Sequence, residues 1–161
     1  MSLPRWSVLV LHGPNLNLLG VREPEIYGHS TLAEIDAAIV HEGALRGATV
    51  TCFQSNHEGA LIDRLHAARG VADGVVLNAG GLTHTSVALL DALRACALPT
   101  IECHLSNPAA REPFRRRSRV APACVGSVSG FGAMSYTLAI QGLIAHLDRR
   151  LHAAGDRETT T

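Results

Sequence analysis

The chain has 161 residues, 47% of them hydrophobic, which predicts one globular domain with a sizeable core. Its 14 basic and 14 acidic residues balance, so bulk charge favours neither nucleic acid nor an anionic membrane as a partner. All of the basic residues are arginine. A chain without lysine excludes a lysine Schiff base, a pyridoxal phosphate anchor and a Walker-type phosphate loop.

No run approaches the roughly 18 apolar residues of a membrane span, and the N-terminal region lacks the pattern of a cleavable signal. We therefore expect a cytoplasmic protein. The four cysteines are scattered without CxxC spacing, which predicts buried thiols and neither disulfides nor a metal site. They are Cys52, Cys96, Cys103 and Cys124.

Apolar runs alternate with segments of helical periodicity along the whole chain. Strands are expected at 6–12, 48–55, 74–80, in the segment that follows Pro99, and at 123–130. Helices are expected at 30–47, 57–70, 84–96, 109–116 as a short interrupted one, and 131–152. Ser30 or Thr31 should cap the first helix, with Glu34 completing a capping box after Thr31. Residues 1–155 should form a single domain, followed by a disordered tail at 156–161.

Five strands that alternate with helices predict right-handed crossovers and a parallel sheet covered on both faces. The expected fold is an α/β, flavodoxin-like, three-layer sandwich with a five-stranded parallel sheet. Ligands of such folds bind at the carboxyl ends of the strands. Four of the expected strands end in polar sequences, namely HGPNLN, QSNHEG, NAGGLTHTS and ECHLSN.

These polar sequences have a simpler interpretation, because Asn, Ser and Gly are common in turns and cap the helices that follow. That alternative stays open for QSNHEG. In NAGGLTHTS, however, Asn78 and His84 exceed what a turn requires. Glu102 and His104 lie two residues apart on an expected strand, hence on one face, where the carboxylate can orient the imidazole for acid and base chemistry.

The segment REPEIYG places Arg22 and Tyr27 in a long connection that we expect to be irregular because proline and glycine interrupt it. It could be a surface turn, but long connections in compact domains are often lids over an active site. A free tyrosine has a pKa near 10, so a tyrosine acting as a base near pH 7 needs about 4 kcal/mol of phenolate stabilisation. A neighbouring guanidinium such as that of Arg22 can supply it.

Five blocks in order resemble the type II 3-dehydroquinate dehydratases of the shikimate pathway and cover nearly the whole chain. They are GPNLNLLGVREPEIYG, QSNHEGALIDRLH, NAGGLTHTSVALLDAL, IECHLSNPAAREPFR, and the segment that begins at VGSVSGFG. The resemblance implies that a single catalytic domain removes water from 3-dehydroquinate, giving 3-dehydroshikimate, without a metal or an organic cofactor. It also implies a homo-oligomer, a dodecamer built from trimers.

The same resemblance implies a role for each matching residue. Tyr27, ionised beside Arg22, would remove a proton from the carbon next to the ketone. Asn15 would hold a water against the resulting enolate oxygen, and His104, oriented by Glu102, would protonate the departing hydroxyl. Substrate contacts would come from Asn78, His84, Asp91, Leu105, Ser106 and Arg115.

Some positions depart from the family pattern. His12 stands where asparagine is usual, and we expect it to pack at the strand end without a catalytic role. Pro108 and Pro113 interrupt the segment that carries Arg115, which puts the local path of that helix in doubt. Alternatives to catalysis are a flavodoxin-like module that binds FMN or a phosphate, and a homologue that has lost activity. The residues do not distinguish aromatic biosynthesis from quinate catabolism.

Overall fold

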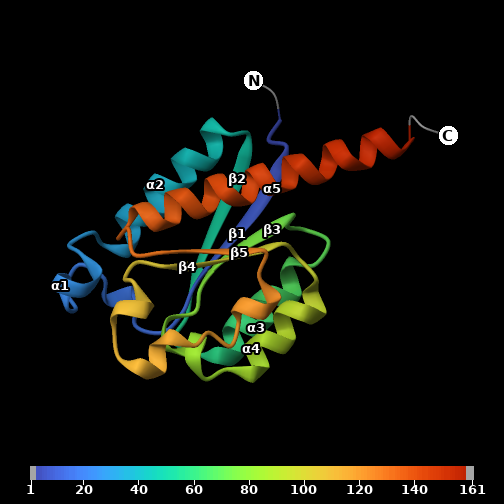
Figure 1. Ribbon diagram of the computed structural model, residues 1–161. Coiled ribbons are helices and arrows are strands. Elements are labelled where there is room, and N and C mark those ends of the chain that lie inside the picture. The colour runs from blue at the N-terminus through green and yellow to red at the C-terminus, as the bar shows by residue number, and fades with distance from the viewer. Residues whose placement is uncertain (1–2, 159–161) are drawn as a thin grey trace.

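The computed structural model describes residues 3–158, which form a five-stranded parallel sheet between two layers of helices (Figure 1). The strands are β1 (Trp6–His12), β2 (Ala48–Gln54), β3 (Gly74–Asn78), β4 (Thr100–His104) and β5 (Gly126–Ser129). Their order across the sheet is β2-β1-β3-β4-β5, and every neighbouring pair is parallel. This order is that of flavodoxin-like folds, so the predicted fold class is confirmed.

Helices cover both faces of the sheet (Figure 1). Helices α2 (Leu32–Leu45) and α5 (Met134–Glu158) cover one face, and α3 (Glu58–Ala68) and α4 (Val87–Cys96) cover the other. The one-turn helix α1 (Pro24–Tyr27) lies in the connection between β1 and α2. At the start of α2, the Thr31 hydroxyl accepts from the backbone N–H of Glu34 and the Glu34 carboxylate accepts from that of Thr31. The predicted capping box is therefore present.

The two faces of the sheet build two separate apolar layers. Along β1, Val8 and Val10 pack with α2 and α5, whereas Leu9 and Leu11 pack with α3 and α4. All four of these side chains are buried. Alternation along a strand that is buried on both sides explains why WSVLVLH is a continuous apolar run.

Two segments differ from expectation because proline begins short helical turns in them. REPEIYG is not wholly irregular, since Pro24 begins the one-turn helix α1, where the absent N–H of proline costs nothing. The expected helix at 109–116 is instead a pair of 3₁₀ turns, Pro108–Ala110 and Pro113–Arg116. One turn of helix carries no periodicity, so the pattern of apolar residues gives no signal for it.

The last helix is longer than expected, because α5 continues past residue 152 to Glu158. Residues 159–161 of the expected disordered tail lie outside the described residues. None of the helices in residues 3–158 combines the length and apolar character needed to cross a membrane.

Candidate active site

The predicted site residues meet at the carboxyl ends of β1, β3 and β4, around a cavity of about 160 Å³. Its walls include Asn15, Arg22, Tyr27, Asn78, His84, His104, Leu105, Ser106 and Arg115. Glu102 lies behind His104, and Asp91 does not line this cavity. Segments as far apart in sequence as 15 and 115 thus contribute to one site, as expected of the carboxyl edge of a parallel sheet.

The turns that follow β1 and β3 are joined by a backbone hydrogen bond and close packing, which positions Asn15 and Asn78. The backbone N–H of Gly13 donates to the carbonyl of Asn78 at 2.7 Å. A Cβ atom at Gly13 would clash with the backbone of Ala79, so only glycine permits this approach. Asn15 itself adopts a left-handed conformation with φ of 70°, which asparagine tolerates better than most residues.

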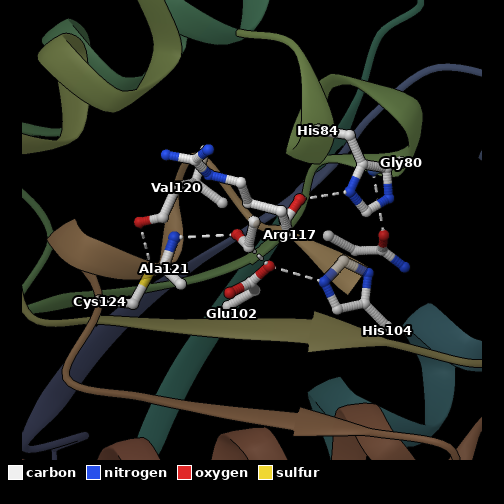
Figure 2. Close-up of polar contacts among 10 residues, drawn as sticks. Gly80, His84, Glu102, His104, Arg117, Val120, Ala121 and Cys124 are labelled. Atoms are coloured by element: carbon white, nitrogen blue, oxygen red, sulfur yellow. Dashed lines mark hydrogen bonds and ion pairs between the residues drawn. The ribbon is translucent and has the colours of Figure 1, made fainter. Parts of the chain in front are cut away.

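Glu102 and His104 form a buried acid–base pair at the end of β4 (Figure 2). The His104 Nε2 lies 2.7 Å from Glu102 Oε1, and the Ser118 hydroxyl donates to the same oxygen at 2.8 Å. Burial alone would raise the pKa of Glu102, but the hydrogen bonds from His104 and Ser118 and the charges of His104 and His84 outweigh it, leaving that pKa below its usual range. The carboxylate is therefore ionised, and it occupies only one nitrogen of the His104 ring.

The segment that follows the Pro113–Arg116 turn supports both histidines of the site (Figure 2). The carbonyl of Arg117 accepts a hydrogen bond from His84 Nδ1 at 2.8 Å. In the neutral ring this leaves His84 Nε2 as an acceptor. Ser118 bonds Glu102 and also accepts from the backbone N–H of Ala121 at 3.0 Å. Sequence reasoning missed Arg117 and Ser118, because their contacts cross between distant segments and follow no local pattern.

Tyr27 lies between two guanidinium groups, so REPEIYG is more than a surface turn. The guanidinium carbons of Arg22 and Arg111 lie 5.2 Å and 5.3 Å from the centre of the Tyr27 ring. Arg111 Nη1 also donates to the Tyr27 hydroxyl at 3.1 Å. The sequence prediction placed Arg22 here but missed Arg111. A signal for it exists, since Arg-Glu-Pro occurs at 22–24 and again at 111–113.

The remaining predicted substrate contacts divide into two groups. Leu105, Ser106 and Arg115 lie at the cavity, and Arg111 Nη1 donates to the Ser106 hydroxyl at 3.3 Å. Asp91 is exposed on α4, away from these residues. The structure therefore brings together every predicted substrate-binding residue except Asp91.

One group of side chains among residues 3–158 has the spacing of metal ligands, with donor atoms of His12, Asp36 and Cys52 all within 4.8 Å of one another. It does not line the cavity. His12 is fully buried, with Nε2 2.8 Å from Asp36 Oδ1 and Nδ1 2.7 Å from the Tyr136 hydroxyl. Burial, the charge of Asp36 and a hydrogen bond to it raise the pKa of Cys52 to about 12, so its thiol is protonated at neutral pH. We assign the group a packing role.

The chain matches the family model described as "Dehydroquinase class II" over residues 6–144. It is 60% identical over 140 residues to the 3-dehydroquinate dehydratase of Parasynechococcus marenigrum, covering 87% of this chain and 96% of that protein. With the 3-dehydroquinate dehydratase of Ruegeria pomeroyi it is 57% identical over 141 residues, which are 88% of this chain and 95% of the relative.

Its fold also resembles the crystal structure of a type II dehydroquinase from Propionibacterium acnes, with a TM-score of 0.85 and 38% sequence identity. That likeness covers 89% of this chain and 99% of the other. Sequence and structure agree over nearly the full length of each relative. The chain belongs to the class II dehydroquinase family.

Proposed function

We propose that this protein is a 3-dehydroquinate dehydratase that converts 3-dehydroquinate to 3-dehydroshikimate. One observation carries the proposal, namely that Tyr27 and His104 line the same cavity. Tyr27 has the guanidiniums of Arg22 and Arg111 beside its ring. A base and an acid in the wall of one cavity suit the loss of a proton and a hydroxyl from a small cyclic substrate. The names of the curated relatives identify that substrate.

In the first step, the phenolate of Tyr27 removes a proton from the carbon next to the substrate ketone. The electrons of the broken C–H bond form an enolate, and Tyr27 becomes neutral. The guanidiniums of Arg22 and Arg111 favour the phenolate because a charged partner next to an ionisable group stabilises its charged form. Asn15, at the cavity wall, holds a water that donates to the enolate oxygen.

In the second step, the enolate re-forms the ketone and the carbon–oxygen bond of the leaving hydroxyl breaks. Protonated His104 gives its proton to that hydroxyl, which leaves as water, and the product is a conjugated enone. Glu102 favours the charged imidazole because its carboxylate lies 2.7 Å from Nε2. Tyr27 then releases its proton to solvent and His104 takes one up, so that both residues regain their starting forms and hydrogen and oxygen balance over the cycle.

Substrate orientation relies on side chains around the cavity. Arg115 offers a planar guanidinium that suits a carboxylate, and Asn78 and His84 offer hydrogen-bonding groups for hydroxyls. Asp91 is exposed and lies outside the cavity wall. It therefore has no part in substrate binding within one copy, and the homo-oligomer built from trimers, up to a dodecamer, is part of the proposal by resemblance alone.

The test is to add 3-dehydroquinate to chelator-treated protein and follow the ultraviolet absorbance of the conjugated enone product. We expect absorbance to rise at a rate proportional to protein concentration, with no added metal or cofactor. A folded protein that binds the substrate without any rise would contradict the proposal. That result would favour the alternative, a flavodoxin-like binding module without catalysis.

A further inference from the structure

The tripeptide Arg-Glu-Pro builds two parts of the site in the same way. In both copies the proline begins a short helical turn, at Pro24 in α1 and at Pro113 in the 3₁₀ turn Pro113–Arg116. In both copies the arginine places its guanidinium about equally far from the centre of the Tyr27 ring, at 5.2 Å and 5.3 Å. The glutamate of each copy pairs with that arginine, at 3.2 Å in the first and 3.7 Å in the second.

Glu112, the glutamate of the second copy, contacts two arginines of the site through one carboxylate oxygen. Its Oε2 lies 2.9 Å from Arg115 Nε and 3.7 Å from Arg111 Nε. Both contacts use the Nε atom, so the terminal nitrogens remain free for other partners. Arg111 uses one of them to donate to Tyr27 and Ser106. Glu112 therefore pairs with two arginine side chains of the site through their Nε atoms and helps to fix their positions.

The carboxylate of Glu112 is ionised under ordinary conditions. A hydrogen bond from its own backbone N–H, together with the hydrogen bond from Arg115 and the charges of Arg115 and Arg111, holds its pKa below the usual range, although desolvation opposes them. Its side chain is 53% exposed. Its charge thus acts on the cavity partly through water, which limits its influence without abolishing it.

The charges around Tyr27 come from three segments of the chain. Two cavities include Tyr27 in their walls, and their charged or titratable lining residues are Arg22, Glu23, His84, His104, Arg111, Glu112 and Arg115, to which α1 adds Glu25. Three guanidiniums therefore face two paired carboxylates, Glu23 and Glu112. Without these carboxylates, the excess positive charge would stabilise the phenolate further and make it a weaker base.

We propose that Glu112 is a positioning residue that holds Arg111 and Arg115 by Nε and, through its negative charge, limits how readily Tyr27 ionises. This inference rests on the proposed function for its catalytic meaning, because it treats Tyr27 as the base. Its physical content, the coupling between Glu112 and the ionisation of Tyr27, stands without any turnover.

The coupling can be measured by following tyrosinate absorbance during a pH titration of the protein without substrate. The chain has two tyrosines, and the other, Tyr136, is fully buried with a pKa raised well above the ordinary value, chiefly by burial. The first tyrosinate to appear therefore reports on Tyr27. Loss of that signal in Tyr27→Phe verifies the assignment.

Glu112→Gln keeps an oxygen that can accept the hydrogen bond from Arg115 Nε but removes the negative charge that pairs with both arginines. We expect the midpoint of the Tyr27 transition to fall by about half a pH unit at low salt, and by less at high salt. Glu112→Asp, which keeps the charge, should restore most of the original midpoint. An unchanged or raised midpoint in Glu112→Gln would overturn the proposal.

Glu42→Gln is the matched control, because Glu42 also pairs with an arginine, Arg46, but on α2 and outside the cavity walls. It should leave the Tyr27 midpoint unchanged.

In kinetics, Glu112→Gln should move the acid limb of kcat/KM to lower pH, as in the titration, and lower kcat at neutral pH. If the unaltered protein does not dehydrate 3-dehydroquinate, the proposed function fails, while the titration still decides the role of Glu112.

Discussion

The two tyrosines of this protein lie in opposite environments. Tyr136, on α5, is fully buried, and its hydroxyl contacts Nδ1 of His12 at 2.7 Å. Burial raises the pKa of Tyr136 well above the ordinary value. Tyr27 is half-buried at the cavity and has the guanidiniums of Arg22 and Arg111 beside it. Burial without a cation therefore keeps the phenol of Tyr136 protonated, whereas Tyr27 has two cations beside it that could pair with a phenolate.

The two histidine–carboxylate pairs lead to the same conclusion. His12 lies 2.8 Å from Asp36, and His104 lies 2.7 Å from Glu102, so hydrogen-bond geometry does not separate them. Access does. The side chain of His12 is 0% exposed and that of His104 is 12% exposed at the cavity wall. A carboxylate-bound histidine therefore becomes a candidate acid only where a substrate can reach it.

Among variants that leave both tyrosines in place, the largest effect is expected for Glu102→Gln, set against Asp36→Asn. The glutamine can still accept from His104, but protonated His104 loses its neighbouring negative charge. We expect kcat to fall by at least about tenfold. Asp36→Asn should leave kcat close to that of the unaltered protein, since its histidine does not reach the cavity. Equal losses in the two variants, measured by steady-state kinetics, would contradict the distinction.

A smaller effect is expected for Arg111→Gln, which removes one of the two guanidiniums beside Tyr27. Weaker stabilisation of the phenolate should move the acid limb of kcat/KM to higher pH by roughly one unit, with about a tenfold loss below that limb. Arg46→Gln, on the surface away from the cavity, is the control and should change neither. A pH profile that does not move in Arg111→Gln would show that Arg22 alone supports Tyr27.

The packing role of His12 should be seen in the free energy of unfolding. His12→Ala leaves the buried hydroxyl of Tyr136 without its 2.7 Å partner, which costs about 1–3 kcal/mol of unfolding free energy. Urea unfolding measures this loss. His66→Ala, at an exposed position on α3, should cost far less. If both variants lost the same free energy, His12 would have no special role in packing.

The smallest effect is expected at the start of α2, away from the cavity and from the buried His12. Thr31→Ala removes the side-chain half of the capping box and should lower the unfolding free energy by about 1 kcal/mol without changing kcat. Thr31→Ser keeps the hydroxyl and should recover most of that loss. A Thr31→Ser variant as unstable as Thr31→Ala would mean that the methyl group, and not the cap, stabilises this helix.

The sequence predicted the sheet well because its strands are continuous apolar runs bounded by turn residues. Asn78, Glu102 and His104 could be placed at the site because each follows or ends such a run. Arg111 was missed because its contact with Tyr27 joins residues 84 positions apart, and the repeated Arg-Glu-Pro was the one sequence signal that pointed to it. Helix α1 was missed since a single turn has no period, and the end of α5 was misplaced because helix ends depend on local contacts that periodicity does not report.

The most direct test compares Tyr27→Phe with Tyr136→Phe in the enone absorbance assay with 3-dehydroquinate, using protein shown to be folded. The two variants remove the same atom from opposite environments. The proposed mechanism predicts that Tyr27→Phe loses turnover by at least about a hundredfold, while substrate-analogue affinity is largely kept and Tyr136→Phe retains activity. Full turnover in Tyr27→Phe would contradict it, because the base would then be another group.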